Sequence, residues 1–203
     1  MRVVLQHLGD GRTEVADAAA PACGPHQVLV RTSRTLVSAG TERMLLQFGK
    51  ASLLGKARSQ PERVRQVLQK ARTDGILPTL SAVRAKLDQP LALGYCNVGT
   101  IIQAGSGATH FRPGDRVASN GGHAGIVAVS ANLSAKVPDG VSDEAAAFTV
   151  LGAVALQGIR LAEPTLGESF AVIGLGLIGL LTVQLLRAHG CRVLGLDPDP
   201  ARL

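Results

Sequence analysis

The spacing of hydrophobic residues changes several times along this chain, and each change marks a segment with a different expected structure. Before residue 42, and again between residues 98 and 137, short apolar runs alternate with turns that contain glycine or proline. Such runs are typical of β-strands, and many short strands with frequent glycine turns predict a small β-barrel. We expect the strands at residues 1–6, 27–32, 98–102, 115–118, 125–129 and 135–137.

Between about residues 44 and 90 the apolar spacing becomes helical. Four apolar residues within 64–71 recur at i, i+3, i+4 and i+7, which places them on one face of a helix with polar residues opposite. Pro61 suits the first turn of this helix, and Gly75 is a stop signal. A second helix is expected after Pro78, so the segment is predicted to be an inserted helical pair.

Helical patterns return before the last segment of the chain. Ser142 opens an alanine-rich helix that is expected to reach about Thr149, and a further helix is expected from Gly152 to Leu161. These helices are predicted to lead from the barrel to the last segment.

The last segment carries a glycine motif between two apolar runs. Residues 169–173 lead into Gly174-Leu175-Gly176-Leu177-Ile178-Gly179, a helix-compatible stretch follows, and a second run at 191–196 ends at Asp197. A strand, this glycine spacing, a helix, a second strand and an acidic residue about 20 positions later form the dinucleotide-binding fingerprint. The alternative is that the glycines only pack a helix against a strand.

Each residue of the fingerprint has an expected physical role. Gly174 permits the tight turn, Gly176 lets the backbone approach a pyrophosphate, and Gly179 allows close helix–strand packing. Leu177 and Ile178 lie at the helix N-terminus, where unpaired N–H groups and the helix dipole attract phosphate. We therefore expect all five residues to bind a dinucleotide.

Asp197 and Arg202 bear on which dinucleotide binds. The carboxylate of Asp197 can accept hydrogen bonds from both ribose hydroxyls, and its charge would repel a 2′-phosphate. NAD is therefore expected in preference to NADP. Arg202 is close enough in sequence to reach the same pocket and to weaken that preference.

The charge of the chain is concentrated in the predicted insertion. The formal net charge is +6, and residues 43–86 carry ten basic and two acidic residues, so the rest of the chain is nearly neutral. Phe48 is the one aromatic residue there that could stack on a base, which argues against nucleic acid as a partner. A solvated helical face is the expected role, and an acidic partner or a phosphate-bearing substrate is the alternative.

Cysteine content and apolar run lengths limit the setting of the protein. Cys23, Cys96 and Cys191 are odd in number and widely spaced, which argues against a disulfide framework and a cysteine zinc cluster. The N-terminus is too polar for a signal peptide, and no apolar run reaches membrane length. A cytoplasmic protein without a membrane partner is expected.

Several motifs in this order resemble the medium-chain dehydrogenase/reductase superfamily. They are Pro113-Gly114-Asp115-Arg116-Val117, the run at residues 135–142 and the glycine fingerprint. The resemblance implies a mixed α/β chain whose residues 1–150 form a GroES-like, alcohol dehydrogenase-like barrel domain with the basic helical insertion at about 44–90. Residues 151–203 would then be a connecting helix and the first β-α-β unit of an incomplete Rossmann-type dinucleotide-binding domain, with the active site between the domains.

A narrower likeness involves the region around the expected active site. Residues 38–42, Gly94-Tyr95-Cys96 and the helical insertion are similar to the bi-domain oxidoreductases, in which a second dehydrogenase module follows the first. Zinc-dependent members of the superfamily have a cysteine ligand where Ala39 stands and a His-Glu pair where Tyr95-Cys96 stands. Alanine has no donor atom and neutral tyrosine is a poor zinc ligand, so no zinc is expected.

Without zinc, other groups must polarise a carbonyl or relay a proton. Thr41 falls where the family has a proton-relaying hydroxyl, and Tyr95 falls on a lost ligand position, so both are candidate catalytic residues. The alternatives are that Thr41 caps a helix and that Tyr95 packs in the barrel with its hydroxyl satisfied. Cys96, His123 and Glu42 are expected to be structural.

Together these patterns predict an NAD-dependent, zinc-independent oxidoreductase acting on a small alcohol or carbonyl compound, with a sugar-derived substrate suggested by the family resemblance alone. The alternative is a non-catalytic dinucleotide- or partner-binding module. The chain ends just after the second strand of a domain that normally has about six, so a partial chain that is inactive alone is expected. A homo-oligomer and a fused C-terminal oxidoreductase domain are the macromolecular partners left open.

Overall fold

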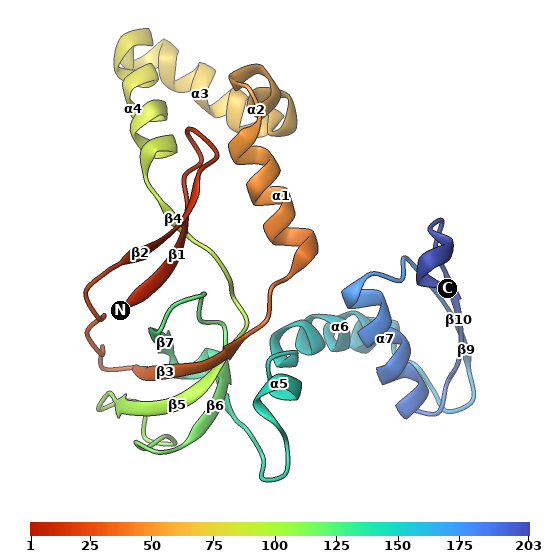
Figure 1. Ribbon diagram of the computed structural model, residues 1–203. Coiled ribbons are helices and arrows are strands. Elements are labelled where there is room, and N and C mark those ends of the chain that lie inside the picture. Colours follow the sequence, from red (N-terminus) through yellow and green to blue (C-terminus); the bar gives the residue numbers. More distant parts are fainter.

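The computed structural model describes residues 1–203, except for the side chains of Leu53, Leu54, Arg63 and Asp74. The chain forms a strand-rich part, a helical arm made by the insertion, and a C-terminal part of helices around a short parallel sheet (Figure 1). Arg63 and Asp74 enter the charge count of the insertion, and Arg63 was expected on the polar face of its helix. Both side chains lie outside the described residues.

Five antiparallel strands form the larger sheet, in the order β7-β3-β5-β6-β8. They are β3 (Gln27–Thr35), β5 (Asn97–Ala104), β6 (Arg116–Ser119), β7 (Ile126–Ser130) and β8 (Ser134–Lys136). Val28 and Val30 lie at alternate positions of β3 and pack with Ile101 and Val117 in a fully buried core. The strands that the apolar runs predicted in this sheet are confirmed, with boundaries that differ by at most three residues.

A smaller sheet has the order β2-β1-β4 and is joined to the larger one by a β-bridge between Val3 and Ala124. Its strands are β1 (Arg2–Gln6), β2 (Thr13–Asp17) and β4 (Leu91–Ala92). The apolar pattern predicted only β1. Strand β2 contains just Val15 and Ala16 as apolar residues, and β4 is two residues long, so neither strand has a recognisable run of its own.

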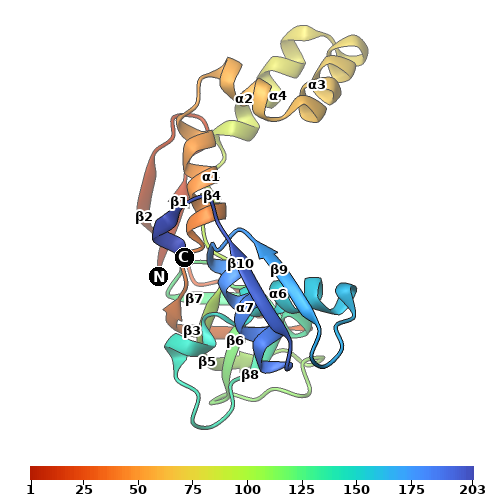
Figure 2. The ribbon, with the colours of Figure 1, turned by 90° about the vertical axis from the view of Figure 1, so that its right-hand side faces the viewer.

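The insertion forms an arm of four helices that projects from the sheets (Figure 2). They are α1 (Ala39–Lys50), α2 (Leu53–Ser59), α3 (Pro61–Asp74) and α4 (Ile76–Asp88). The expected stop at Gly75 is confirmed, with φ +91°. Three expectations are wrong: the insertion contains four helices rather than a pair, its helical region begins at Ala39 rather than near 44, and α4 begins before Pro78. Pro78 fits the first turn of α4 because an N–H there needs no intrahelical acceptor.

The arm is only partly solvated, although the sequence predicts a solvated helical face. The apolar face of α3 is incompletely covered, since Leu68 is 59% exposed. In α2, Lys56 is only 7% exposed, and its Nζ donates to the carbonyl oxygens of Leu8 at 2.6 Å and Gly9 at 3.1 Å. This basic residue therefore attaches the arm to the loop after β1 instead of facing solvent.

The C-terminal part begins with two helices and continues into the glycine motif. Its elements are α5 (Asp143–Ala146), α6 (Thr149–Ala162), β9 (Ser169–Ile173), α7 (Leu177–Ala188) and β10 (Arg192–Leu196). Ser142 caps α5 by accepting the N–H of Ala145 at 3.2 Å. Strands β9 and β10 pair in parallel, and α7 connects them, as the fingerprint predicts.

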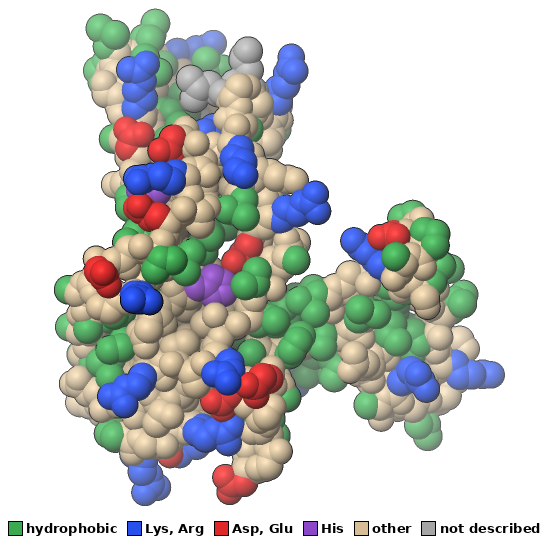
Figure 3. Space-filling view, in the orientation of Figure 1, with side chains coloured by type: hydrophobic (Ala, Val, Ile, Leu, Met, Phe, Trp, Pro, Cys, Tyr) green, Lys and Arg blue, Asp and Glu red, His purple; other side chains and the backbone are tan. Residues whose placement is uncertain are grey.

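One side of this small parallel sheet is covered and the other is open. Ile159, Leu186 and Cys191 form a buried cluster under the sheet, whereas Ile173 is 82% and Leu194 62% exposed. Figure 3 shows hydrophobic side chains gathered where the chain passes from the sheets along α6 toward β9. Within the described residues, no helix is long and apolar enough to cross a membrane.

Candidate functional site

The glycine motif forms a tight turn between β9 and α7 that only glycine can make. Gly174 has φ +92°, a conformation that residues with a side chain rarely adopt. A Cβ on Gly179 would lie 1.9 Å from the carbonyl oxygen of Gly174, so α7 packs directly against the turn. The packing role expected of Gly179 therefore matches the geometry.

The outer side of the same turn is open. Among the described residues, and apart from its neighbours along the chain, a Cβ added to Gly176 would have only Arg202 Nη1 within 4 Å, at 4.0 Å, so the peptide backbone there is accessible to a ligand. Gly176 is the N-cap of α7, and Leu177 and Ile178 begin the helix. Because first-turn N–H groups have no intrahelical acceptor and the dipole is positive at this end, the turn is suited to a phosphate. These residues fit the diphosphate of a dinucleotide.

Asp197 is already engaged by the protein backbone at the end of β10. Its Oδ2 accepts the N–H of Leu175 at 2.7 Å, its Oδ1 accepts the N–H of Asp199 at 2.9 Å, and its side chain is 2% exposed. The N–H of Asp199, and next that of Leu175, hold the pKa of Asp197 below its usual value because they stabilise the carboxylate. The carboxylate therefore fixes the glycine turn to β10, a role that the sequence reasoning missed.

Arg202 lies beside the carboxylate and over the glycine turn. Its Nη1 is 3.6 Å from Asp197 Oδ2, and its Nε is 3.4 Å from Asp199 Oδ2. The guanidinium is half exposed and near the open space above Gly176. The guanidinium of Arg202 and the carboxylate of Asp197 therefore lie together where the fingerprint predicts the adenosine ribose.

The structure brings the two candidate catalytic residues together and adds a third hydroxyl. Tyr95 Oη lies 2.7 Å from Ser38 Oγ and 3.2 Å from Thr41 Oγ1. Because Tyr95 has one hydroxyl proton, at least one of these contacts uses a proton from Ser38 or Thr41 if both are hydrogen bonds. Ser38 was not singled out from the sequence. A serine before a helix suggests only a cap, and Tyr95 is 57 positions away.

The start of α1 explains why Ser38 is free to meet Tyr95. Ser38 is the N-cap residue, but its side chain makes no capping hydrogen bond. Instead, Glu42 Oε1 accepts the backbone N–H of Ser38 at 2.8 Å. The alternative that Thr41 caps the helix is wrong, since Thr41 is the third residue of α1. The alternative that Tyr95 packs in the barrel with its hydroxyl satisfied holds in part, because the residue is half-buried and its hydroxyl is hydrogen-bonded.

Glu42, His123 and Cys96 lie just behind the hydroxyls. Glu42 Oε2 and His123 Nε2 are 2.9 Å apart, and their side chains are only 7% and 9% exposed. Burial first, and the negative charge of Glu42 second, raise the pKa of the fully buried Cys96 thiol to about 11. This environment disfavours a nucleophilic thiolate. The expected structural reading of these three residues agrees with their contacts.

The side chains around the hydroxyls do not form a metal site. Among the residues whose side chains are described, no three His, Cys, Asp or Glu groups lie close enough to hold a metal ion. Ala39 is the first residue of α1, next to Ser38, and carries no ligand atom. The groups in contact with Tyr95 Oη are the neutral hydroxyls of Ser38 and Thr41, which are poor zinc ligands.

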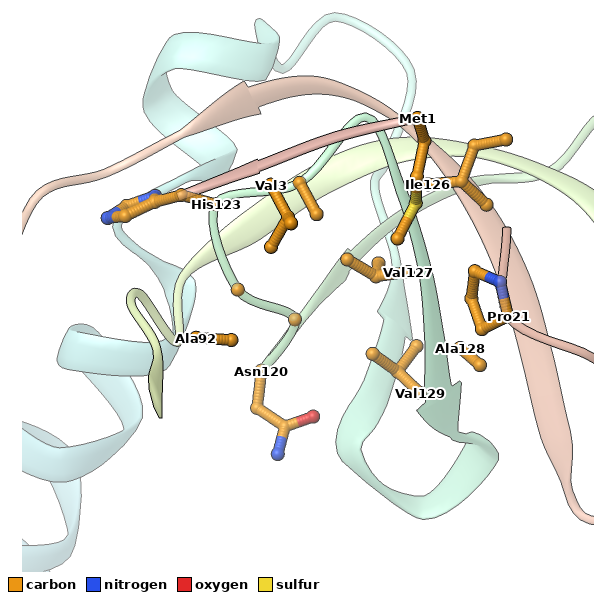
Figure 4. Close-up of a pocket in the computed structure, with 13 residues that line it drawn as sticks. Met1, Val3, Pro21, Ala92, Asn120, His123, Ile126, Val127, Ala128 and Val129 are labelled. Carbon is orange, nitrogen blue, oxygen red and sulfur yellow. The ribbon is translucent and has the colours of Figure 1, made fainter. Parts of the chain in front are cut away.

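A cavity lies beside this region and not within it. It has a volume of about 330 Å³ and is lined chiefly by apolar residues of β1 and β7, such as Val3 and Val127. Figure 4 shows His123 at one end of the cavity with its ring directed away from these side chains. Neither Tyr95 nor the glycine turn lines it. The cavity therefore does not define the candidate active site.

Comparison with known proteins gives a consistent set of relatives. No family model matches the chain. It is 27% identical to the uncharacterized zinc-type alcohol dehydrogenase-like protein YphC of Escherichia coli, over 69% of this chain and 53% of that protein. It is 34% identical to the D-guloside 3-dehydrogenase of Escherichia coli, over 52% and 31%. It is 29% identical to the (R,R)-butanediol dehydrogenase of Bacillus subtilis, over 56% and 41%. The chain thus spans between about a third and about half of the length of these relatives.

Solved structures resemble the whole chain. The alcohol dehydrogenase TADH from Thermus sp. ATN1 has a TM-score of 0.73 at 21% identity, and the match covers 100% of this chain and 60% of that one. A quinone oxidoreductase of Escherichia coli, solved in complex with NADPH, has a TM-score of 0.71 at 16% identity, with 100% and 54% covered. These similarities show the fold and confirm the predicted mixed α/β class.

Sequence and fold comparisons agree on one group, the alcohol dehydrogenase-like and quinone oxidoreductase-like proteins. The curated and structural neighbours of the chain are alcohol dehydrogenase-like and quinone oxidoreductase-like members of the medium-chain dehydrogenase/reductase superfamily. The narrower likeness to bi-domain oxidoreductases stays a prediction, as do the domain boundary near residue 150 and the roles of individual site residues.

Proposed function

We propose that the protein is an oxidoreductase that interconverts a small alcohol and its carbonyl compound with a nicotinamide dinucleotide and without catalytic zinc. The observation that carries this proposal is the meeting of Tyr95 with Ser38 and Thr41, at the positions where the family resemblance implies a zinc ligand and a relay hydroxyl. Relatives named as butanediol, sorbitol and D-guloside dehydrogenases favour a polyol or sugar-derived substrate.

The dinucleotide would bind at the glycine turn. Gly174, Gly176 and Gly179 shape the turn, and the first N–H groups of α7 would bind the phosphates of the dinucleotide. Asp197 favours NAD over NADP through its negative charge, and Arg202 opposes that preference. When bound, the nicotinamide ring supplies or accepts the hydride.

The hydroxyl cluster would act on the substrate oxygen. In carbonyl reduction, Tyr95 Oη donates a hydrogen bond to that oxygen and so stabilises the negative charge that develops there. Ser38 Oγ and Thr41 Oγ1 hold Tyr95 Oη in place. Thr41 is exposed at the start of α1 and can pass a proton between the cluster and solvent, in either direction of the reaction.

Substitution of Gly176 tests the cofactor assignment without disturbing the fold. In Gly176→Val the first added carbon would meet only Arg202, and φ at this position is −69°, which any residue adopts. We expect the variant of the full-length protein to unfold like the parent but to lose NAD binding, measured by calorimetry, because the side chain occupies the space of the pyrophosphate. Affinity equal to that of the parent would refute the cofactor assignment.

A second measurement separates the enzyme from the alternative binding module. The full-length protein and its Tyr95→Phe variant would be screened with NAD, NADP and a panel of polyols and sugars. Turnover that falls in Tyr95→Phe while NAD affinity is unchanged supports the proposed mechanism. Tight NAD binding with no turnover by the parent favours the non-catalytic module.

A further inference from the structure

We propose that Glu42 and His123 are positioning residues that set the geometry of the hydroxyl cluster formed by Ser38, Thr41 and Tyr95. Their consequence for catalysis rests on the proposed function, whereas their effect on Tyr95 does not. The pair lies behind the cluster and touches neither the glycine turn nor the space above it.

The carboxylate of Glu42 uses both oxygens to connect two distant segments. Oε1 accepts the backbone N–H of Ser38 at 2.8 Å, and Oε2 meets His123 Nε2 at 2.9 Å. The first contact fixes the residue that carries one hydroxyl of the cluster. The second fixes that residue to the turn that precedes β7.

His123 in turn holds the segment that carries Tyr95. A Cβ on Gly94 would lie 2.7 Å from His123 Cγ, so the imidazole ring lies directly against the residue before Tyr95. The backbone N–H of His123 also donates to the carbonyl oxygen of Leu93 at 2.7 Å. Both sides of the cluster are therefore attached to one buried pair.

Packing alone does not require such a pair at this place. Burying charged or strongly polar partners carries a desolvation cost, and apolar residues of similar size are often at least as stabilising. The pair orients the segments that it joins, because hydrogen bonds have preferred angles as well as preferred distances. His7 and Glu14 provide a comparison. They form a 2.8 Å contact of the same kind, with side chains 17% and 35% exposed.

Tyr95 gives a direct readout of its own surroundings. It is the only tyrosine in this chain and there is no tryptophan, so the intrinsic fluorescence of the 203-residue chain comes from Tyr95 alone. We would measure emission intensity and iodide quenching for Glu42→Gln and His123→Ala, with Glu14→Gln and His7→Ala as matched controls. Neither cofactor nor substrate is needed.

We expect Glu42→Gln and His123→Ala to change both fluorescence properties and the two controls to leave them as in the parent. The amide of Glu42→Gln keeps the shape of the side chain and an acceptor for Ser38, so this variant decides the question if His123→Ala does not fold. Unchanged Tyr95 fluorescence in a folded Glu42→Gln chain, with circular dichroism like that of the parent, would overturn the proposal.

Turnover of the full-length protein provides the link to catalysis. If Tyr95 binds the substrate oxygen, Glu42→Gln should lower kcat by roughly tenfold to a hundredfold, as expected for a small misplacement of a reacting group, with NAD affinity unchanged. If Glu42→Gln alters Tyr95 fluorescence but both Glu42→Gln and Tyr95→Phe keep full activity, the positioning role is supported. The proposed function of Tyr95 is then refuted.

Discussion

Replacing Lys56 with methionine should loosen the attachment of the helical arm. Methionine keeps most of the length and the apolar part of the side chain, so the change removes mainly the ammonium group and its contacts with the carbonyl oxygens of Leu8 and Gly9. A hydrogen bond to a charged group contributes about 1.5–3 kcal/mol. Water can reach the half-exposed loop and replace one of the two contacts. We therefore expect a loss of about 1.5–3 kcal/mol in the free energy of unfolding.

Urea denaturation followed by circular dichroism measures this loss, and limited trypsin digestion reports whether the arm opens before the sheets. Arg58→Met is the matched control, because Arg58 lies on the same helix and is exposed. We expect the control to stay within about 0.5 kcal/mol of the parent, as surface substitutions usually do. If Lys56→Met is as stable and as resistant to trypsin as Arg58→Met, Lys56 does not hold the arm.

Two further predictions concern ionisable groups. Asp197 has a lowered pKa in the folded chain, so its stabilising effect is present above its ordinary pKa of about 4 and is lost as the pH falls through the lowered value. Asp197→Ala should therefore speed amide exchange of Leu175 at neutral pH, whereas the parent should lose this protection only in acid; equal exchange in both at neutral pH would contradict the assignment. Cys96, buried and with a pKa of about 11, should react with a thiol reagent at pH 8 far more slowly than Cys23, and mass spectrometry of the labelled peptides would show the order.

Local patterns in the sequence predicted the parts of the structure that depend on neighbouring residues. The glycine turn is one case, because the conformation of Gly174 and the approach of Gly179 are set by residues a few positions away. The end of α3 at Gly75 is another. In both cases a glycine permits a positive φ that other residues rarely adopt.

The parts that were missed depend on contacts between distant residues. Ser38 joined the candidate site only because the fold brings Tyr95 to the start of α1. Lys56 was counted among solvated charges, and only the loop after β1 gives its ammonium group two carbonyl partners. Asp197 was expected to accept hydrogen bonds from a ribose, but its carboxylate already accepts the backbone N–H groups of Leu175 and Asp199. A side-chain spacing along the chain contains no information about such partners.

The open side of the β9–β10 sheet has a practical consequence for any work with this chain. An apolar strand edge with unpaired backbone groups is a template for pairing with another molecule. With Ile173 and Leu194 largely exposed, the chain is expected to self-associate at high concentration through this surface. Its apparent size in solution should therefore grow with concentration, so the fluorescence and exchange measurements require dilute samples.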